Sequence, residues 1–209
     1  MTPVPDPEQL DQIKLAPADP RVHELIRKRW SPRAFSDREV SPQDLRVLFE
    51  AAEWAASSFN EQPWRFIVAT RADQPNWNKL LECLVEANQT WARHAPVLML
   101  TAAKRTFSQT GKPNSHALHD TGMALANLML QATFMGLGAH AMAGFHHDQS
   151  RAAFSIPDDY DLGAAVAIGY PGDPASLPPR LQAAEIAPRT RQPLSDIVFS
   201  GAWGQPAVL

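Results

Sequence analysis

The chain has 209 residues, of which 44% are hydrophobic and 20% are charged, so it holds enough apolar material for the core of a single domain. Its formal net charge of −3 argues against broad nucleic-acid binding, and any basic site must therefore be local. The one cysteine, Cys83, excludes an intramolecular disulfide and a zinc site built from several cysteines, and it fits a reducing cytoplasm.

We expect residues 1–20 to form an N-terminal arm, as a mobile segment or an isolated short helix, and residues 21–209 to form one domain. The arm is rich in Pro and Asp and has no apolar core, so it does not resemble a signal peptide. Hydrophobic spacing and turn residues predict helices at 21–28, 41–56, 75–92, 116–136 and 149–154, and strands at 64–70, 95–102, 140–143 and 162–170.

The predicted helix 116–136 is apolar on nearly all sides, which is typical of a helix in a core or at a subunit interface. Polar residues and glycines interrupt residues 121–147 too often for a membrane span. Cys83 lies among leucines in the predicted helix 75–92, so we expect a buried structural thiol. Residues 171–188 are a Pro-rich excursion, and the tail 194–204 is too short for its own core, so it is expected to pack on another element or another subunit.

A cationic cluster follows the first predicted helix of the domain. Residues 27–33 contain four cations and the hydroxyl of Ser31, and Pro32 biases Ser31 away from helical geometry. Arginines that converge with a hydroxyl suit a phosphate, because the guanidinium is a planar and permanently charged fork of donors. The alternative is a solvated basic helix end, which the helix dipole favours.

A second basic pair, Arg189 and Arg191, lies far along the chain. The two are spaced i, i+2, so in extended structure both side chains point the same way. The two basic clusters of an otherwise acidic protein can converge on one phosphate monoester. Without such a ligand they are ordinary surface arginines.

Two uncharged segments are further candidates. Residues 57–64 are rich in amide and hydroxyl groups that can bind a heteroaromatic ring or a ribityl chain, and the alternative is a capped helix end with a turn. Residues 142–145 follow a predicted strand, and Gly144 permits close approach of the backbone to a ligand. The alternative for that segment is a tight turn.

Other chemistries have weaker signals. His116, His119 and Asp120 share a helical turn, and residues 146–148 are His-His-Asp, but no pair has the i, i+4 spacing of a helical zinc motif, so no metal is expected. The sequence has no Gly-x-Ser-x-Gly elbow of a hydrolase. It also lacks the Gly-x-Gly-x-x-Gly and phosphate-loop motifs of dinucleotide and nucleoside triphosphate sites.

The chain resembles the nitroreductase family of flavin-mononucleotide (FMN) enzymes over about residues 21–199. The resemblance rests on residues 29–35 (RWSPRAF), 57–64 (SSFNEQPW), 136–138 (GLG), 142–145 (MAGF), 167–170 (AIGY) and 189–191 (RTR). It implies an α+β fold of three layers, with a mixed central β-sheet flanked by helices, in an intertwined homodimer that holds two flavin sites at its interface. From the single cysteine, the net charge and the interrupted apolar segment we expect a cytoplasmic protein with no nucleic-acid or membrane partner. The C-terminal tail is expected to pack on itself or on the partner subunit.

The resemblance assigns roles to individual residues. Arg29, Ser31 and Arg33 would hold the flavin phosphate and the ribityl or pyrimidine groups, with the backbone of Trp30, and Arg189 and Arg191 would complete the phosphate cradle. The remaining cofactor-binding residues would be Ser57, Ser58 and Asn60 from the second subunit, Asn88 at the isoalloxazine edge, and Met142, Ala143 and Gly144, where the amides of Ala143 and Gly144 face N5 and O4.

The implied activity is transfer of hydride from NADH or NADPH through flavin N5, by a ping-pong mechanism, to nitroaromatic, quinone or similar acceptors. No catalytic side chain is needed, because the cofactor supplies the chemistry. Two positions depart from well-known members: Ala143 stands where many have an acidic residue, and Trp91 where a lysine is common. The alternatives are an enone reductase, dehalogenase or flavin-processing enzyme on the same scaffold, a non-catalytic flavin-binding dimer, and, more remotely, a metal enzyme that uses His116, His119 and His146.

Overall fold

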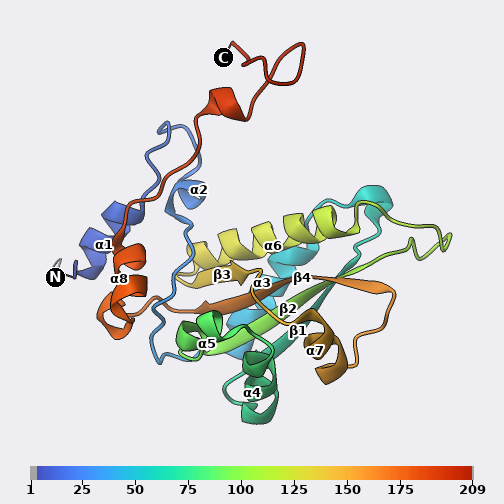
Figure 1. The fold of residues 1–209 in the computed structure, drawn as a ribbon, viewed down its shortest axis with the longest axis horizontal. Coiled ribbons are helices and arrows are strands. Elements are labelled where there is room, and N and C mark those ends of the chain that lie inside the picture. Colours follow the sequence, from blue (N-terminus) through green and yellow to red (C-terminus); the bar gives the residue numbers. More distant parts are fainter. Residues whose placement is uncertain (1–3, 209) are drawn as a thin grey trace.

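A four-stranded sheet in the order β1-β2-β4-β3 lies at the centre of the computed structural model, which describes residues 4–208 (Figure 1). The strands are β1 (Trp64–Thr70), β2 (Val97–Lys104), β3 (Gly138–Met142) and β4 (Tyr160–Gly169). The α+β class is confirmed, but the described strands pair antiparallel throughout instead of forming the expected mixed sheet. The reason is that β4 lies between β2 and β3, which run in the same direction, and the chain returns from β2 to β3 through a crossover helix.

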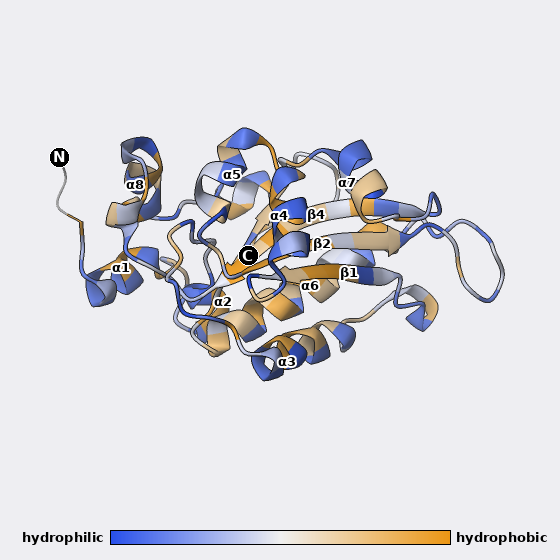
Figure 2. Ribbon diagram, turned by 90° about the horizontal axis from the view of Figure 1, so that it is seen from below, coloured by the Kyte–Doolittle hydropathy of each residue, from blue (hydrophilic) through white to orange (hydrophobic). Residues whose placement is uncertain are grey.

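Helices cover both faces of the sheet and make three layers (Figures 1 and 2). The helices of one face are α3 (Pro42–Glu53) and α6 (Ala117–Phe134), and those of the other are α4 (Gln74–Glu82), α5 (Glu86–Ala92) and α7 (His147–Ala153). Successive residues of β2 point to opposite faces, so Val97 and Met99 join the core under α6, and Leu98 and Leu100 join the core under α4 and α5. Buried on both sides, β2 forms the middle of the molecule.

The predicted helix 75–92 is two helices in the structure. It breaks because Leu84 forms a β-bridge with Phe145, and the amide of Val85 donates to the Gly144 carbonyl at 3.1 Å. Cys83 forms the C-cap of α4 and is fully buried, which confirms the expectation of a buried thiol. The loop after β3 is therefore attached to the start of α5, and this attachment positions part of the candidate site.

Three short helices lie at the end of the sheet where β3 begins (Figure 1). They are α1 (Pro7–Lys14), α2 (Glu24–Lys28) and α8 (Pro179–Ile186). Helix α8 lies in the Pro-rich segment in which no helix was predicted, and it starts at Pro179 because a proline is accepted in the first turn. Residues 1–3 of the expected N-terminal arm and residue 209 lie outside the described residues.

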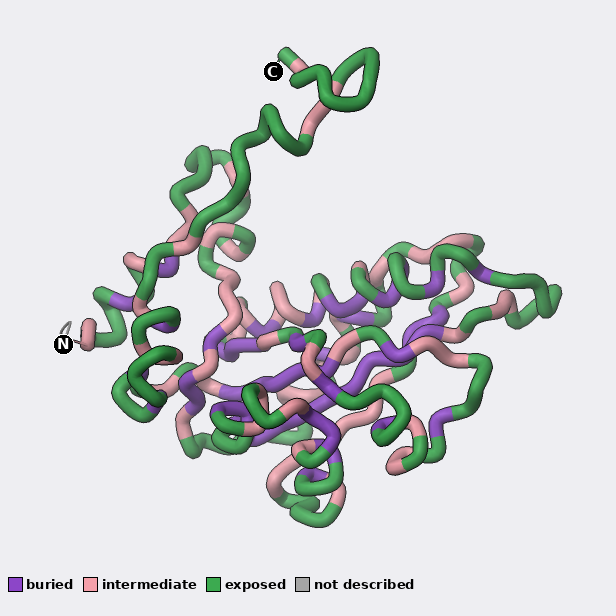
Figure 3. Tube along the Cα trace, viewed as in Figure 1, coloured by how far each residue is buried: buried purple, intermediate pink, exposed green. Residues whose placement is uncertain are grey.

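The C-terminal tail leaves the body of the chain and contains the short 3₁₀ turn Leu194–Asp196 (Figures 1 and 3). Its large apolar side chains Leu194, Ile197 and Trp203 are exposed, and Trp203 reaches 92% exposure. On the body, Leu118 and Phe134 of α6 are also exposed. Nothing within residues 4–208 covers these surfaces, and across that range no helix is both long and apolar enough to cross a membrane.

Candidate functional site

Four arginines from two distant segments line one cavity of about 230 Å³. Arg29 and Arg33 come from the extended segment after α2, whereas Arg189 and Arg191 come from the segment after α8. The structure thus brings the two basic clusters of the sequence together. Trp30 and Ser31 line the same cavity.

Hydrogen bonds fix the two arginine segments to each other. The guanidinium of Arg189 donates to the backbone carbonyls of Arg27 and Arg29, and the guanidinium of Arg29 donates to the hydroxyl of Ser31 at 3.3 Å. Burial and the nearby charge of Arg191 lower the pKa of Arg29. The pKa of Arg189 is also lowered, mainly by burial and then by the charges of Arg29 and Arg191. Even so, arginines remain charged at neutral pH, so the cavity is strongly electropositive.

The carboxylate of Glu185 supports this cavity from α8. Its Oε1 atom accepts the amides of Arg33 at 2.7 Å and Ala34 at 2.9 Å, and the side chain is 1% exposed. Its Oε2 atom lies 3.9 Å from the Arg33 guanidinium and has no hydrogen-bond partner. Burial raises the pKa of Glu185, whereas the two amides oppose that rise. Sequence analysis missed this residue because its partners lie more than 150 positions away.

His140 on β3 holds the arginine segment against the sheet. Its Nδ1 atom lies 2.9 Å from the Pro32 carbonyl, and its ring contacts Trp91 of α5 with a centroid distance of 4.6 Å. Burial lowers the pKa of His140 to about 4, so Nδ1 carries the proton of a neutral imidazole and donates it to Pro32. Gly138 lets β3 and the segment at Pro32 approach this closely, because a Cβ at position 138 would lie 2.2 Å from Cγ of Pro32.

The loop after β3 is held by α5. Asn88 donates its amide to the Gly144 carbonyl at 2.9 Å, and a Cβ on Gly144 would lie 2.7 Å from that amide nitrogen. Asn88 lies three residues before Trp91 on the same helix, and Trp91 contacts His140, which bonds the Pro32 carbonyl. This series of contacts links the loop after β3 to the arginine segment.

The loop with Ser57, Ser58 and Asn60 lies elsewhere. The loop precedes β1, and β1 begins at Trp64, which pairs with Ala103 near the C-terminal end of β2. The arginine segment lies near the other end of β2: Phe35 bridges Pro171, which follows β4, and the last part of β4 pairs with Val97 at the start of β2. The length of β2, about 24 Å for eight residues, separates the two ends. Within one chain the structure does not bring this loop to the arginines.

The same loop is strained and rigidly held. Phe59, Asn60 and Gln62 have φ values of 53°, 56° and 51°, a left-handed conformation that is costly for residues other than glycine. The amide of Ser58 donates to the buried carboxylate of Asp120 at 2.9 Å, and the Ser57 hydroxyl accepts from the Gln62 amide at 3.0 Å. Side chains that are fixed in this way are suited to contact a ligand.

The residues of the arginine cavity fit a phosphate monoester. The cavity has space for such a group, its lining contains four permanent cations, and the guanidinium of Arg189 retains a buried Nε donor without a partner. The histidines fit a metal less well: His119 contacts Asp120 at 3.0 Å, but Asp120 also accepts from Ser58. Across residues 4–208, three or more metal-ligating side chains of His, Cys, Asp or Glu do not gather at any point.

The chain is similar in sequence and in fold to known proteins. The model of the nitroreductase family matches residues 26–170. A protein of Xanthomonas oryzae with the name "Putative NADH dehydrogenase/NAD(P)H nitroreductase" is 31% identical over 76% of this chain and 89% of its own length. A crystal structure described as an oxidoreductase containing FMN is 35% identical, with a TM-score of 0.85 over 91% of this chain and 96% of that chain. A nitroreductase family protein from Clostridium difficile is 29% identical, with a TM-score of 0.66 over 85% of this chain and 96% of that chain.

Proposed function

This chain belongs to the nitroreductase family, and on that premise we propose that it is an FMN-dependent oxidoreductase that takes electrons from NADH or NADPH. The observation that carries the proposal is the cavity in which Arg29, Arg33, Arg189 and Arg191 converge. FMN ends in a phosphate monoester, which this cavity suits. The FMN-containing structure and the NAD(P)H-linked name among the relatives support the same cofactor and donor.

Each part of the site has a task. The arginines and Ser31 bind the phosphate, and Glu185 and His140 fix the backbone from which two of the arginines project. Asn88 holds the Gly144 carbonyl, so the amides of Ala143 and Gly144 would be fixed to face the ring of bound FMN. The flavin would supply the hydride chemistry at N5, and one site would take the nicotinamide and then the acceptor, in a ping-pong order.

The second half of the site comes from another copy of the chain. Ser57, Ser58 and Asn60 lie at the far end of the sheet from the arginines of their own chain. The tail and α6 both expose large apolar side chains, which a second copy would cover. We therefore propose a homodimer in which the loop at 57–62 of one subunit completes the arginine site of the other.

The acceptors that we propose are nitroaromatics and quinones, because planar ring systems can stack where the nicotinamide stacks. Phe59, in the loop that completes the site, is 90% exposed, and its ring meets the half-buried Phe107 ring edge to face with centroids 5.8 Å apart. The exposed Phe59 ring would provide an apolar surface for such an acceptor.

Subunit complementation tests the shared site. Arg29→Ala removes a cavity cation, and Asn60→Gly removes a loop amide while it keeps the left-handed backbone. Each variant alone is expected to lose FMN. When the two are unfolded together and refolded in equal amounts, random pairing restores one intact site in each mixed dimer, or about a quarter of all sites. If mixing restores no FMN binding, the site is not shared between subunits.

A further inference from the structure

A fifth cation lines the arginine cavity and comes from the N-terminal helix α1. Lys14 is the last residue of this helix and is only 4% exposed, which is rare for a lysine without a carboxylate partner. It lies outside residues 26–170, the part that the family model matches.

Two contacts hold the Lys14 ammonium at the cavity. Its Nζ atom donates to the Ala187 carbonyl at 2.6 Å and lies 4.9 Å from the centroid of the Trp30 ring. Ala187 and Trp30 line the same cavity as the arginines. An ammonium group has three donors, so the carbonyl leaves others for a ligand.

The charges around Lys14 favour an anion. Five cations line the cavity, against the single carboxylate of Glu185, whose Oε1 atom is already taken by two backbone amides. Burial lowers the pKa of Lys14, the charge of Glu185 opposes this, and Arg189 and Arg33 add to the lowering. A bound dianion would relieve the repulsion among these cations.

We propose that Lys14 is a phosphate ligand and that helix α1 closes on the phosphate group of the flavin. The inference rests on the proposed function, because that function identifies the anion in the cavity as the phosphate of FMN. It makes α1 part of the cofactor site, and it predicts that the chain distinguishes FMN from riboflavin, which lacks the phosphate, partly through Lys14.

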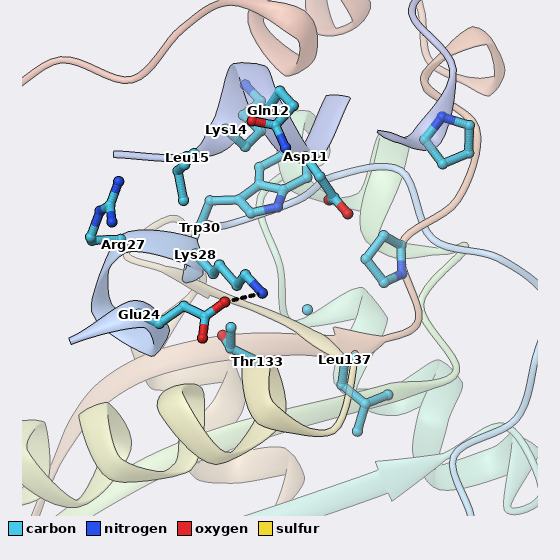
Figure 4. Close-up of a pocket in the computed structure, with 14 residues that line it drawn as sticks. Asp11, Gln12, Lys14, Leu15, Glu24, Arg27, Lys28, Trp30, Thr133 and Leu137 are labelled. Carbon is cyan, nitrogen blue, oxygen red and sulfur yellow. Dashed lines mark ion pairs between the residues drawn. The ribbon is translucent and has the colours of Figure 1, made fainter. Parts of the chain in front are cut away.

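The test compares Lys14→Met with a matched control. Methionine keeps the apolar stem and removes the charge. The control is Lys28→Met, since Lys28 is exposed and pairs with Glu24 at 2.5 Å. Lys28 lines a neighbouring cavity that Lys14 and Trp30 also border (Figure 4), but it does not line the arginine cavity. FMN and riboflavin are titrated into each flavin-free protein, and binding is followed by the quenching of flavin fluorescence.

Lys14→Met is expected to weaken FMN binding about tenfold or more and to leave riboflavin binding unchanged, while Lys28→Met changes neither. Equal loss of both flavins would show a merely structural role and overturn the proposal, as would unchanged FMN binding. Failure of the unaltered protein to bind FMN more tightly than riboflavin would instead overturn the proposed function.

A second measurement needs no variant. Trypsin cleaves after lysine, so the cleavage rate after Lys14 reports how firmly α1 is docked, and cleavage after the exposed Lys79 of α4, outside the arginine cavity, serves as the internal reference. Saturating FMN, or inorganic phosphate at millimolar concentration, is expected to slow cleavage after Lys14 relative to Lys79, whereas riboflavin is not. A Lys14 cleavage rate that is the same with and without FMN and phosphate contradicts the proposal.

Discussion

Acidification should weaken the fold through one half-buried histidine. His140 is held by a hydrogen bond to the Pro32 carbonyl and by contact with the ring of Trp91. Its pKa in the folded chain is about 4, against an ordinary value of 6.5, chiefly because burial disfavours the charged form. Arg33 and Arg29 nearby lower the pKa further.

The sign and size of the effect follow from linkage. Above pH 6.5 the imidazole is neutral in both states and contributes no pH dependence. Between pH 6.5 and about 4 the unfolded chain binds the proton and the folded chain does not, so stability falls as the pH falls. At about 1.4 kcal/mol per pH unit, this window corresponds to a loss of about 3 kcal/mol from His140 alone.

The assay is urea unfolding of the flavin-free protein at pH 7, 6, 5 and 4.5, at one protein concentration. The matched variant is His140→Phe, which keeps a ring against Trp91 but cannot bind a proton. It should be less stable at pH 7, because the hydrogen bond to Pro32 is lost, and it should lose less stability on acidification. Parallel pH profiles for the two proteins would refute the argument.

Three other perturbations test the packing and the cavity. Arg29→Ala should weaken FMN binding at least tenfold and spare riboflavin, as measured by titration, and equal losses for both would argue against a phosphate contact. Gly138→Ala drives a Cβ into Pro32 and should cost about 1–3 kcal/mol in thermal unfolding, whereas Gly122→Ala meets open space; equal melting temperatures would be inconsistent with that close approach. The thiol of Cys83 is buried, and burial raises its pKa, so in the folded protein it should react with a thiol reagent far more slowly than in the protein unfolded in urea. Similar reaction rates in the two states would show that the thiol is accessible in the folded protein.

Local sequence signals identified most of the secondary structure. The strand 64–70 was predicted with the bounds that the structure shows, because Pro63 precedes a run of aromatic and β-branched residues. The start of α3 was predicted from Ser41, whose hydroxyl accepts the Asp44 amide at 3.0 Å. These features depend on neighbours in the chain, so they can be read from sequence.

Features that depend on distant contacts could not be predicted. The break between α4 and α5 arises from the pairing of Leu84 with Phe145, which lies 61 residues away. The left-handed residues Phe59 and Gln62 are not glycines, so no residue type marks the strain. The prolines of residues 171–188 argue against a helix, so helix α8, which begins at Pro179, could not be predicted.

The candidate site divides along the same line. The residue type itself indicates phosphate binding, because guanidinium groups suit phosphates. Sequence alone therefore suggests a phosphate site for Arg29, Arg33, Arg189 and Arg191. The residues that hold them in place, Glu185 and His140, could not be predicted, because a buried carboxylate and a half-buried imidazole carry no local signal. Lys14 was assigned only to an N-terminal arm, and its burial against Ala187 gave it a place at the site.

The most direct test of the central claim is anaerobic reduction of the purified protein reconstituted with FMN. The protein should be yellow, NADH or NADPH should bleach its flavin absorbance, and a quinone or a nitroaromatic compound should restore that absorbance without oxygen. Bound FMN that neither nicotinamide reduces would contradict the account and leave a flavin-binding dimer without turnover.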